Sequence, residues 1–258
     1  ARTAFAGLLR VDVGRVETAY STGITHRAVH LMGMENLYVQ MADRPEAVHR
    51  LLAFLAEDNL ALGQWEEEQG LLTLNHDGNQ GTCSGSCFAT DETARAAGSR
   101  VAATDRWGFL ESQESAGISG EMFDAFLMPH LTRLAARFKL LKFGCCEAVH
   151  PLMACLRRLP NLRKVSVTPW CDIRQLAESC PHNVIWCRKP VPLLLCGDAF
   201  RPETLRAHLQ ETLDAGRGFF IEFVFRDTNR LSGAMADRIA ATCAMVRALT
   251  GRPDGSRG

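Results

Sequence analysis

The sequence lacks any apolar run that approaches the ~20 residues needed to cross a bilayer. It also lacks an excess of either charge, because 29 Lys and Arg residues balance 29 Asp and Glu residues. Without a global positive field, the composition does not favour binding to nucleic acid or to an anionic membrane. The opening residues ARTAFAGLLR do not have the basic start, apolar stretch and cleavage site of a signal peptide. These absences predict a cytoplasmic protein that binds neither nucleic acid nor membrane.

Cysteine is too sparse for a disulfide scaffold, at 10 among 258 residues. The adjacent pair Cys145 and Cys146 suits free thiols in a reducing compartment better than a disulfide framework. Also missing are the P-loop, the G-x-S-x-G nucleophile elbow, the H-E-x-x-H zinc helix and a glycine-rich dinucleotide fingerprint. What is present is an ordinary globular composition, 47% hydrophobic and 22% charged, with ample material for a core.

Helical and strand-like segments alternate along the chain. Apolar residues recur at helical spacing over 44–69, with Asp43 as the expected N-cap and Gly70 at the end. Further helices are predicted over 120–138, 147–159, 172–180, 202–216 and 232–250. Short apolar runs predict buried strands at 71–78, 107–112, 140–144, 163–169, 183–187 and 219–225, with a weaker one at 8–13. The loop over 78–90 is too long and polar to belong to the core.

Strands that alternate with helices predict a parallel α/β fold, and the continuous apolar strands fit burial on both faces. A complete TIM (β/α)8 barrel needs eight strands, whereas six are found after residue 70. We therefore predict a barrel without its first one or two βα units, in agreement with a chain that opens on Ala1 rather than Met. This single domain covers 1–250, and a disordered tail covers 251–258. An open doubly wound sheet is the alternative.

Functional groups in such a barrel follow the carboxyl ends of the strands, so the residues there form one rim. Polar, acidic and thiol side chains occupy these positions in the sequence. We predict substrate-binding roles for residues of this rim and its strands: Asn75, Asp77, Trp107, Gln113, Glu114, Trp170, Arg188 and Lys189.

Thiol and carboxylate groups at the strand ends indicate a metal site. KFGCCE (142–147) brings two thiols and a carboxylate to one strand end, and zinc accepts both S and O donors. Adjacent strand residues point to opposite faces, so Cys145 and Cys146 share one ion only if the strand has already turned. The predicted ligands are Cys145, Cys146, Glu147 and Glu222. Buried core cysteines are the alternative.

Glu222 stands out because FFIEFVF (219–225) is otherwise wholly apolar. Burying an ionised carboxylate costs several kcal/mol unless it is paired or binds a metal. We predict that Glu222, with Glu147, is catalytic as an acid or base or as a ligand. The alternative is a salt bridge from Glu222 to Arg188, Lys189 or Arg226.

Several segments resemble one family. DRPEAVHRLL (43–52), WGFLESQE (107–114), FGCCEAVH (143–150), LPNLRKVSVTPWCD (159–172) and RKP (188–190) are similar, in order, to the uroporphyrinogen decarboxylase superfamily. Within it they resemble most the uroporphyrinogen decarboxylase-like methyltransferases of anaerobic bacteria. The likeness extends from about residue 35 to about residue 250. It implies a (β/α)8 barrel with a longer N-terminus than this chain has.

The methyltransferases of this family hold zinc through His-x-Cys at one strand end and a further Cys at the last strand. Here the matching segment is Phe143-Gly144-Cys145, without the histidine, and the last strand offers Glu222 or Asp227 instead of cysteine. The resemblance implies zinc-dependent methyl transfer from a small methylated substrate, such as an O-methyl compound, to a corrinoid on a partner protein. Zinc would act as a Lewis acid on the methyl donor or acceptor.

The resemblance leaves two alternatives open. Decarboxylases of the superfamily act on uroporphyrinogen III in porphyrin biosynthesis without a metal, using an N-terminal arginine motif and a C-terminal histidine. The arginine motif lies outside this chain, and 223–233 contains no histidine. A near-neutral charge also disfavours an octa-anionic substrate. The second alternative is a degenerate, non-catalytic barrel that serves binding.

Overall fold

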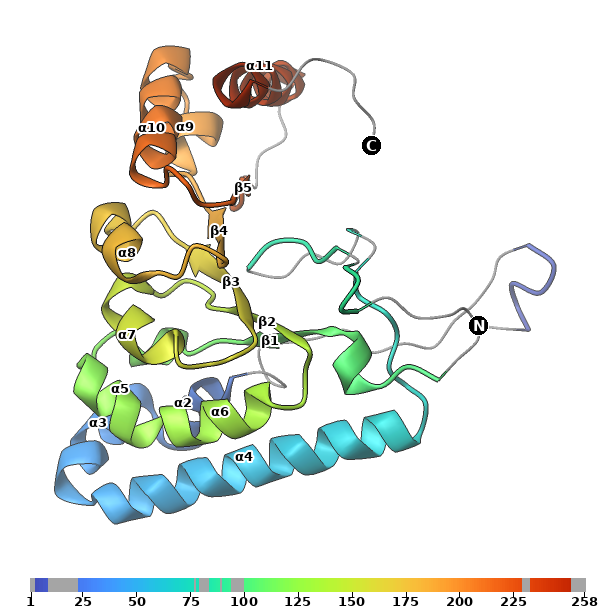
Figure 1. Cartoon of the computed structure of the whole chain (residues 1–258), viewed down its shortest axis with the longest axis vertical. Helices are drawn as coiled ribbons and strands as arrows, with labels where there is room; N and C mark the ends of the chain where they lie inside the picture. The colour runs from blue at the N-terminus through green and yellow to red at the C-terminus, as the bar shows by residue number, and fades with distance from the viewer. Residues whose placement is uncertain are drawn as a thin grey trace.

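A computed structural model describes residues 3–8, 23–76, 78, 84–88, 90–93, 100–228 and 233–251 of the protein. In these residues, five strands form one sheet in the order β1-β2-β3-β4-β5, and each strand pairs in parallel with the next. Figure 1 shows the strands stacked from β1 to β5 with helices along one side. The predicted parallel α/β fold is confirmed. The strands are β1 (Trp107–Leu110), β2 (Leu140–Phe143), β3 (Leu162–Val167), β4 (Ile185–Arg188) and β5 (Ile221–Phe223).

Helices precede the sheet and connect its strands. Those before β1 are α2 (Ile24–Met32), α3 (Met34–Asp43) and α4 (Pro45–Glu68), and α4 is the long helix at the bottom of Figure 1. Later in the chain come α5 (Gly120–Phe126), α6 (Met128–Ala135), α7 (Met153–Leu156), α8 (Ile173–Ser179), α9 (Leu193–Cys196), α10 (Pro202–Ala215) and α11 (Gly233–Thr250). Single 3-10 turns are η1 (Ala103–Asp105), η2 (Gln113–Ser115) and η3 (His150–Leu152). None of the helices in the described ranges has the length and apolar character to cross a membrane.

The core lies between the helices and one face of the sheet. Side chains alternate between the two faces along a strand, and Phe143, Val165 and Trp186 are fully buried on the helix side. Trp186 stacks on Phe219 with ring centroids 4.6 Å apart. Each large apolar side chain buried in this way stabilises the fold by about 1.5–3 kcal/mol. This layer holds the strands in register and so positions the loops at their carboxyl ends.

The structure confirms five of the predicted strands and corrects a sixth. Residues 71–76 belong to no strand, contrary to the prediction for 71–78. The reason is local: the Asn75 side chain accepts from the backbone N–H of Trp107 and donates to its carbonyl, at 3.1 Å and 2.9 Å. A side-chain amide therefore takes the place of backbone pairing at this edge of β1. The weak strand at 8–13 lies almost entirely outside the described residues.

The helix predictions are confirmed in part. The helix over 44–69 is α4, but its N-cap is Arg44, because Asp43 is the last residue of α3. The predicted helix over 120–138 is two helices, α5 and α6, since Pro129 lacks the N–H that a continuous helix needs and instead starts α6. Over 147–159 only η3 and α7 form. Predictions for α8, α10 and α11 are confirmed, whereas α2, α3 and α9 were not predicted.

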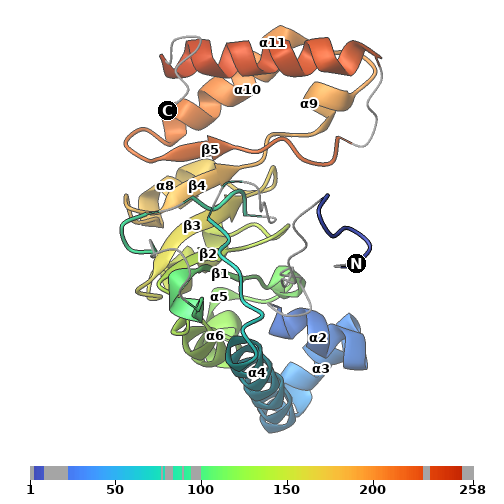
Figure 2. The ribbon, with the colours of Figure 1, turned by 90° about the vertical axis from the view of Figure 1, so that its right-hand side faces the viewer.

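Part of the polar loop over 78–90 is buried, which corrects the expectation that it stays outside the core. Ser84 and Cys87 are fully inaccessible to solvent. Figure 1 shows this green-cyan part of the chain on the side of the sheet opposite α7, α8 and α10, and Figure 2 shows it passing in front of the strands. The segment 84–88 therefore covers the second face of the sheet.

Candidate functional site at the carboxyl ends of the strands

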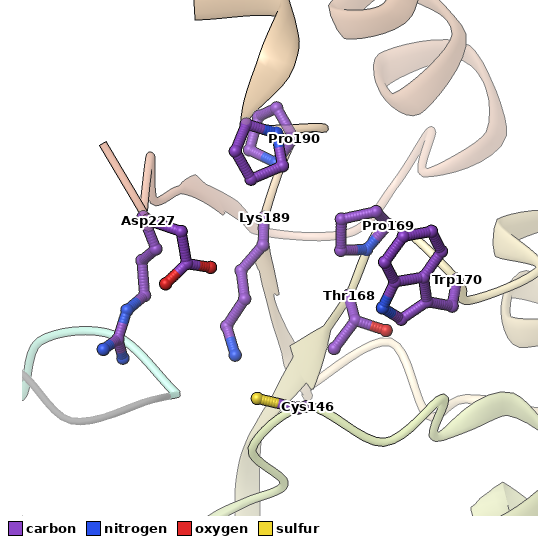
Figure 3. Close-up of a pocket in the computed structure, with 9 residues that line it drawn as sticks. Cys146, Thr168, Pro169, Trp170, Lys189, Pro190 and Asp227 are labelled. Atoms are coloured by element: carbon purple, nitrogen blue, oxygen red, sulfur yellow. The ribbon is translucent and has the colours of Figure 1, made fainter. Parts of the chain in front are cut away.

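A small cavity lies where β2, β3, β4 and β5 end. It has a volume of about 120 Å³, whereas one water needs only about 10–15 Å³, so a small organic molecule fits. In α/β proteins, ligands bind at the carboxyl ends of parallel strands. Its lining residues are Cys146, Thr168, Pro169, Trp170, Lys189, Pro190, Pro192, Arg226 and Asp227, most of which Figure 3 labels.

Lys189 places a buried cation at the cavity. It directly follows β4, its backbone N–H donates to the Val167 carbonyl at 2.8 Å, and its side chain is 7% exposed. Its ammonium donates to the Cys145 carbonyl, and an ammonium carries two further N–H donors. Figure 3 shows the Lys189 amine, the Cys146 sulfur and the Asp227 carboxylate around the same space. A proton donor, a nucleophile and an acceptor are thus grouped together.

The segment after β5 adds an anion and a second cation, Asp227 and Arg226. Asp227 has φ 60°, and in the described part of the chain it is the only residue other than glycine with a positive φ. Asp tolerates this left-handed conformation better than most residues, but it is uncommon and concentrates at functional sites. The sharp turn at Asp227 places it beside Lys189 at the cavity.

One wall of the cavity is apolar. After β3 ends at Val167, the chain continues through Thr168, Pro169 and Trp170, and the Cys171 N–H closes a turn onto the Thr168 carbonyl at 3.1 Å. Trp170 is 74% exposed, although large aromatic side chains are usually well buried. An exposed ring at a cavity mouth offers a flat apolar surface to a ligand. This wall suits an apolar or aromatic part of a small molecule.

The cysteine pair follows β2 after the strand has turned. β2 ends at Phe143, and Gly144 takes φ 100°, a backbone conformation that residues other than glycine rarely adopt. The sulfur atoms of Cys145 and Cys146 consequently lie 3.6 Å apart instead of on opposite faces. Cys145 is buried and Cys146 is exposed at the cavity. The structure thus meets the condition under which both thiols approach one point.

Glu147 is buried behind the cavity and serves to join two strand ends. Its carboxylate accepts backbone N–H groups of Ser112 at 3.0 Å and of Cys145 at 2.7 Å. Burial raises the pKa of Glu147, and the backbone N–H donors, together with the charge of Lys189, oppose this rise only in part. Its predicted catalytic role stays a prediction, because it is not among the residues that line the cavity.

Glu222 lies on the second face of the sheet. It forms an ion pair with Lys164 at 2.6 Å and accepts the backbone N–H of Ser86 at 3.2 Å. The alternative expected for Glu222, a salt bridge, is therefore the one observed, but its partner is Lys164 and not Arg188, Lys189 or Arg226. Burial, and secondarily the Glu222 carboxylate, raise the pKa of the neighbouring Cys187 to about 12.

Sequence reasoning missed the lysines of this second face. Lys142 is 1% exposed and donates to the Cys87 sulfur at 2.9 Å, while Lys164 is 2% exposed and also donates to the Ser86 carbonyl at 2.7 Å. The sequence signal for such a lysine was present in LLKF (140–143), where a single charged residue lies between apolar neighbours. Such a pattern indicates two faces with different surroundings.

Of the predicted substrate-binding residues, Trp170 and Lys189 line the cavity. Arg188 points to the helix side, donating to the Thr168 carbonyl at 2.5 Å and to the Thr212 hydroxyl at 3.3 Å. Glu114, next to Gln113 in η2, accepts from Thr25 and contacts His26, both at 2.9 Å. Asn75 and Trp107 bind each other, as described above. Asp77 lies outside the described residues. Binding roles for these residues stay predictions.

The predicted zinc ligands are Cys145, Cys146, Glu147 and Glu222, and the structure shows other partners for the two glutamates. Both carboxylates already accept protein donors, and the ammonium of Lys164 lies directly at Glu222. In the ranges that the structure covers, no three His, Cys, Asp or Glu residues gather around one point. The four-residue ligand set therefore stays a prediction from the sequence.

Comparison with known proteins adds no identity: no family model matches the chain, and no curated protein matches it.

Proposed function

We propose that this chain is a barrel enzyme of the uroporphyrinogen decarboxylase superfamily that removes a methyl group from a small methylated molecule. The sheet order β1-β2-β3-β4-β5 supports the barrel, because consecutive strands are neighbours in a (β/α)8 barrel. The observation that carries the function is the cavity where Lys189, Cys146 and Asp227 meet.

The size of the cavity favours a small substrate. At about 120 Å³ it is below the 300–1,000 Å³ or so typical of sites for drug-sized ligands. A tetrapyrrole with eight carboxylates is too large for this cavity, whereas a methylated compound with a single ring or none fits. Trp170 and the flanking prolines would contact its apolar part, and Lys189 would reach a polar atom.

Lys189 is the residue that we expect to assist the reaction. When a methyl group leaves an oxygen, the electrons of the broken C–O bond remain on that oxygen as negative charge. The Lys189 ammonium stabilises this charge and donates a proton to the oxygen, while the Cys145 carbonyl holds the amine in place. The methyl acceptor is then a nucleophile from outside the chain, which the family resemblance assigns to a reduced corrinoid on a partner protein.

The test is an assay of methyl transfer to cob(I)alamin from a panel of methyl ethers and methylamines. The absorbance of methylcobalamin measures the rate. General acid catalysis contributes about 100-fold or more, so Lys189→Met should lower the rate by at least this factor. The exposed Lys139→Met is the matched control and should leave the rate unchanged. Parallel assays with added zinc and with a chelator test the predicted metal separately.

Decarboxylation is the second candidate, because two cations, Lys189 and Arg226, line the cavity and suit a carboxylate. Carbon dioxide release from uroporphyrinogen III without a methyl acceptor would favour it over methyl transfer. Ligand binding without turnover in either assay would instead indicate the non-catalytic barrel.

A further inference from the structure

Two neighbouring thiols lie in contact beside the cavity: Cys146 is exposed and lines it, Cys145 is buried, and their sulfurs are 3.6 Å apart. We propose that Cys145 and Cys146 are a redox-active dithiol and that their reversible disulfide rearranges the cavity. Formation of the bond does not depend on the proposed function, whereas its effect on activity does.

The local backbone prepares the pair. Gly144 at φ 100° turns the chain immediately before the cysteines, and a side chain at this position would lie 3.1 Å from atoms of Ser166 and Val149. Both thiols therefore leave the same turn toward one side. Only a modest approach separates the observed contact from a disulfide, whose sulfurs lie about 2.05 Å apart.

A bond between adjacent cysteines is strained and therefore easily reversed. Neighbouring Cα atoms are about 3.8 Å apart, closer than the roughly 4.4–6.8 Å of most disulfides. Strained or exposed disulfides have more oxidising potentials and are the labile, regulatory ones. We expect the pair to be reduced under ordinary cytoplasmic conditions and oxidised only when an oxidant is present.

Hydrogen peroxide supplies the oxidising equivalents. The exposed Cys146 thiolate attacks one peroxide oxygen, the O–O bond breaks, and hydroxide leaves with the electron pair to become water after protonation. The Cys145 thiolate then attacks the resulting sulfenic sulfur, so the S–S bond forms and a second water leaves. Two thiols lose two protons and two electrons in total, and one peroxide becomes two waters.

The carbonyl of Cys145 links this bond to the cavity. It belongs to the peptide between the two cysteines and accepts from the Ser166 hydroxyl at 2.8 Å and from the Lys189 ammonium. Closing an eight-membered ring across this peptide turns the carbonyl, which weakens the contact with Lys189. Oxidation thus withdraws the Cys146 sulfur from the cavity wall and releases the ammonium.

The bond is tested by mass spectrometry on the whole chain. Trypsin cleaves after Lys142 and Arg157, so one peptide carries Cys145, Cys146 and Cys155. Cys155→Ser is therefore the background. After oxidation with one equivalent of hydrogen peroxide and alkylation of remaining thiols, this peptide should lose the mass of two hydrogens, and dithiothreitol should restore it.

Matched variants decide the result. Cys146→Ser in the same background should abolish the two-hydrogen loss, and Cys243→Ser, which removes another exposed thiol in α11, should leave it unchanged. Because Cys146 is exposed, its replacement by serine is compatible with folding. Added oxygen mass on Cys146, or a bond from either cysteine to a different peptide, would overturn the proposal.

The effect on Lys189 is tested without an activity assay. Acetylation by an N-hydroxysuccinimide ester, quantified by peptide mass, should be several-fold faster at Lys189 in the oxidised chain than in the reduced chain. The exposed Lys139 should react equally in both. Equal acetylation rates at Lys189 in the oxidised and the reduced chain, with the disulfide formed, would show that the bond does not rearrange the cavity.

Discussion

The two faces of the sheet differ in chemistry although the same strands form both. The helix side is mainly apolar, with Phe143, Val165 and Trp186 fully buried. The opposite side carries Lys142 and Lys164, which are equally buried but charged. One face therefore stabilises the fold by removing apolar area from water, whereas the other keeps buried charges only because each has a specific partner.

The partners on the charged face come largely from the segment 84–88. Ser86 contributes its N–H to Glu222 and its carbonyl to Lys164, and Cys87 contributes its sulfur to Lys142. A Cβ at Gly85 would lie 2.5 Å from a Glu222 oxygen, so this close approach requires glycine. The segment 84–88 and the buried charged residues therefore depend on each other for their positions. The apolar face does not need partners from this segment.

The largest effect is expected on the apolar face. Trp186→Ala should lower the free energy of unfolding by about 3–5 kcal/mol, because it leaves a cavity in the core. Urea denaturation followed by circular dichroism measures the change. Trp65→Ala in α4 is the control, since Trp65 is 51% exposed, and its cost should stay below about 1 kcal/mol. Equal losses would contradict the assignment of the core to the helix side.

The next effect concerns the ion pair of the charged face. Glu222→Gln should cost about 1–3 kcal/mol, because the buried Lys164 ammonium loses its carboxylate. Replacing both partners, as in Lys164→Met with Glu222→Leu, should recover part of this loss. Urea denaturation of the single and double variants gives the coupling energy. Strictly additive effects would show that the two side chains do not interact.

Glu147 makes a smaller, pH-dependent contribution. Its pKa is raised by burial from an ordinary 4.5, so the folded state binds the proton more tightly than the unfolded state does. Stability from this group is full below pH 4.5 and is lost as the pH rises through the raised folded pKa. Glu147→Gln cannot titrate, so the stability advantage of the natural chain over this variant should shrink with rising pH.

Unfolding free energies of the natural chain and of Glu147→Gln, measured by urea denaturation at a series of pH values, test this expectation. The glutamine side chain still accepts one of the two backbone N–H groups, which limits the loss at low pH to about 1 kcal/mol. A difference that grows with pH would mean that the backbone donors outweigh burial.

The smallest effect is expected for an ion pair at the surface. Arg133 and Glu57 lie 2.6 Å apart, with side chains 48% and 62% exposed. Arg133→Ala should change the unfolding free energy by no more than about 0.5–1 kcal/mol, since solvent screens exposed charges. Thermal denaturation alongside Glu222→Gln makes the comparison direct. A larger cost for Arg133 would remove the distinction between the buried pair and the surface pair.

Much of the fold was predictable because the signals are local. Apolar runs such as LLKF (140–143) and the helical spacing over 45–68 identify β2 and α4 from neighbouring residues alone. The misses have local causes that periodicity does not record. Asn75 replaces backbone pairing with its side chain, and Pro129 divides one apolar pattern into two helices.

The candidate site was predictable only in part. Lys189 and Trp170 follow strands, and position in the sequence was enough to choose them. Arg188 also follows this rule, yet as the last residue of β4 it points to the helix side and contacts Thr212. A shift of one residue decides which face a side chain occupies, and the end of a strand is uncertain by at least that much from sequence.

Short-range apolar patterns in the sequence specify most of the strands and helices, and their alternation indicates a parallel sheet. Long-range contacts, in contrast, set the partner of Glu222, the burial of 84–88 and the groups that meet at the cavity. Ser86 and Glu222 are 136 residues apart in the chain, and Lys164 and Glu222 are 58 apart. Contacts over such separations form only when the whole sheet has assembled.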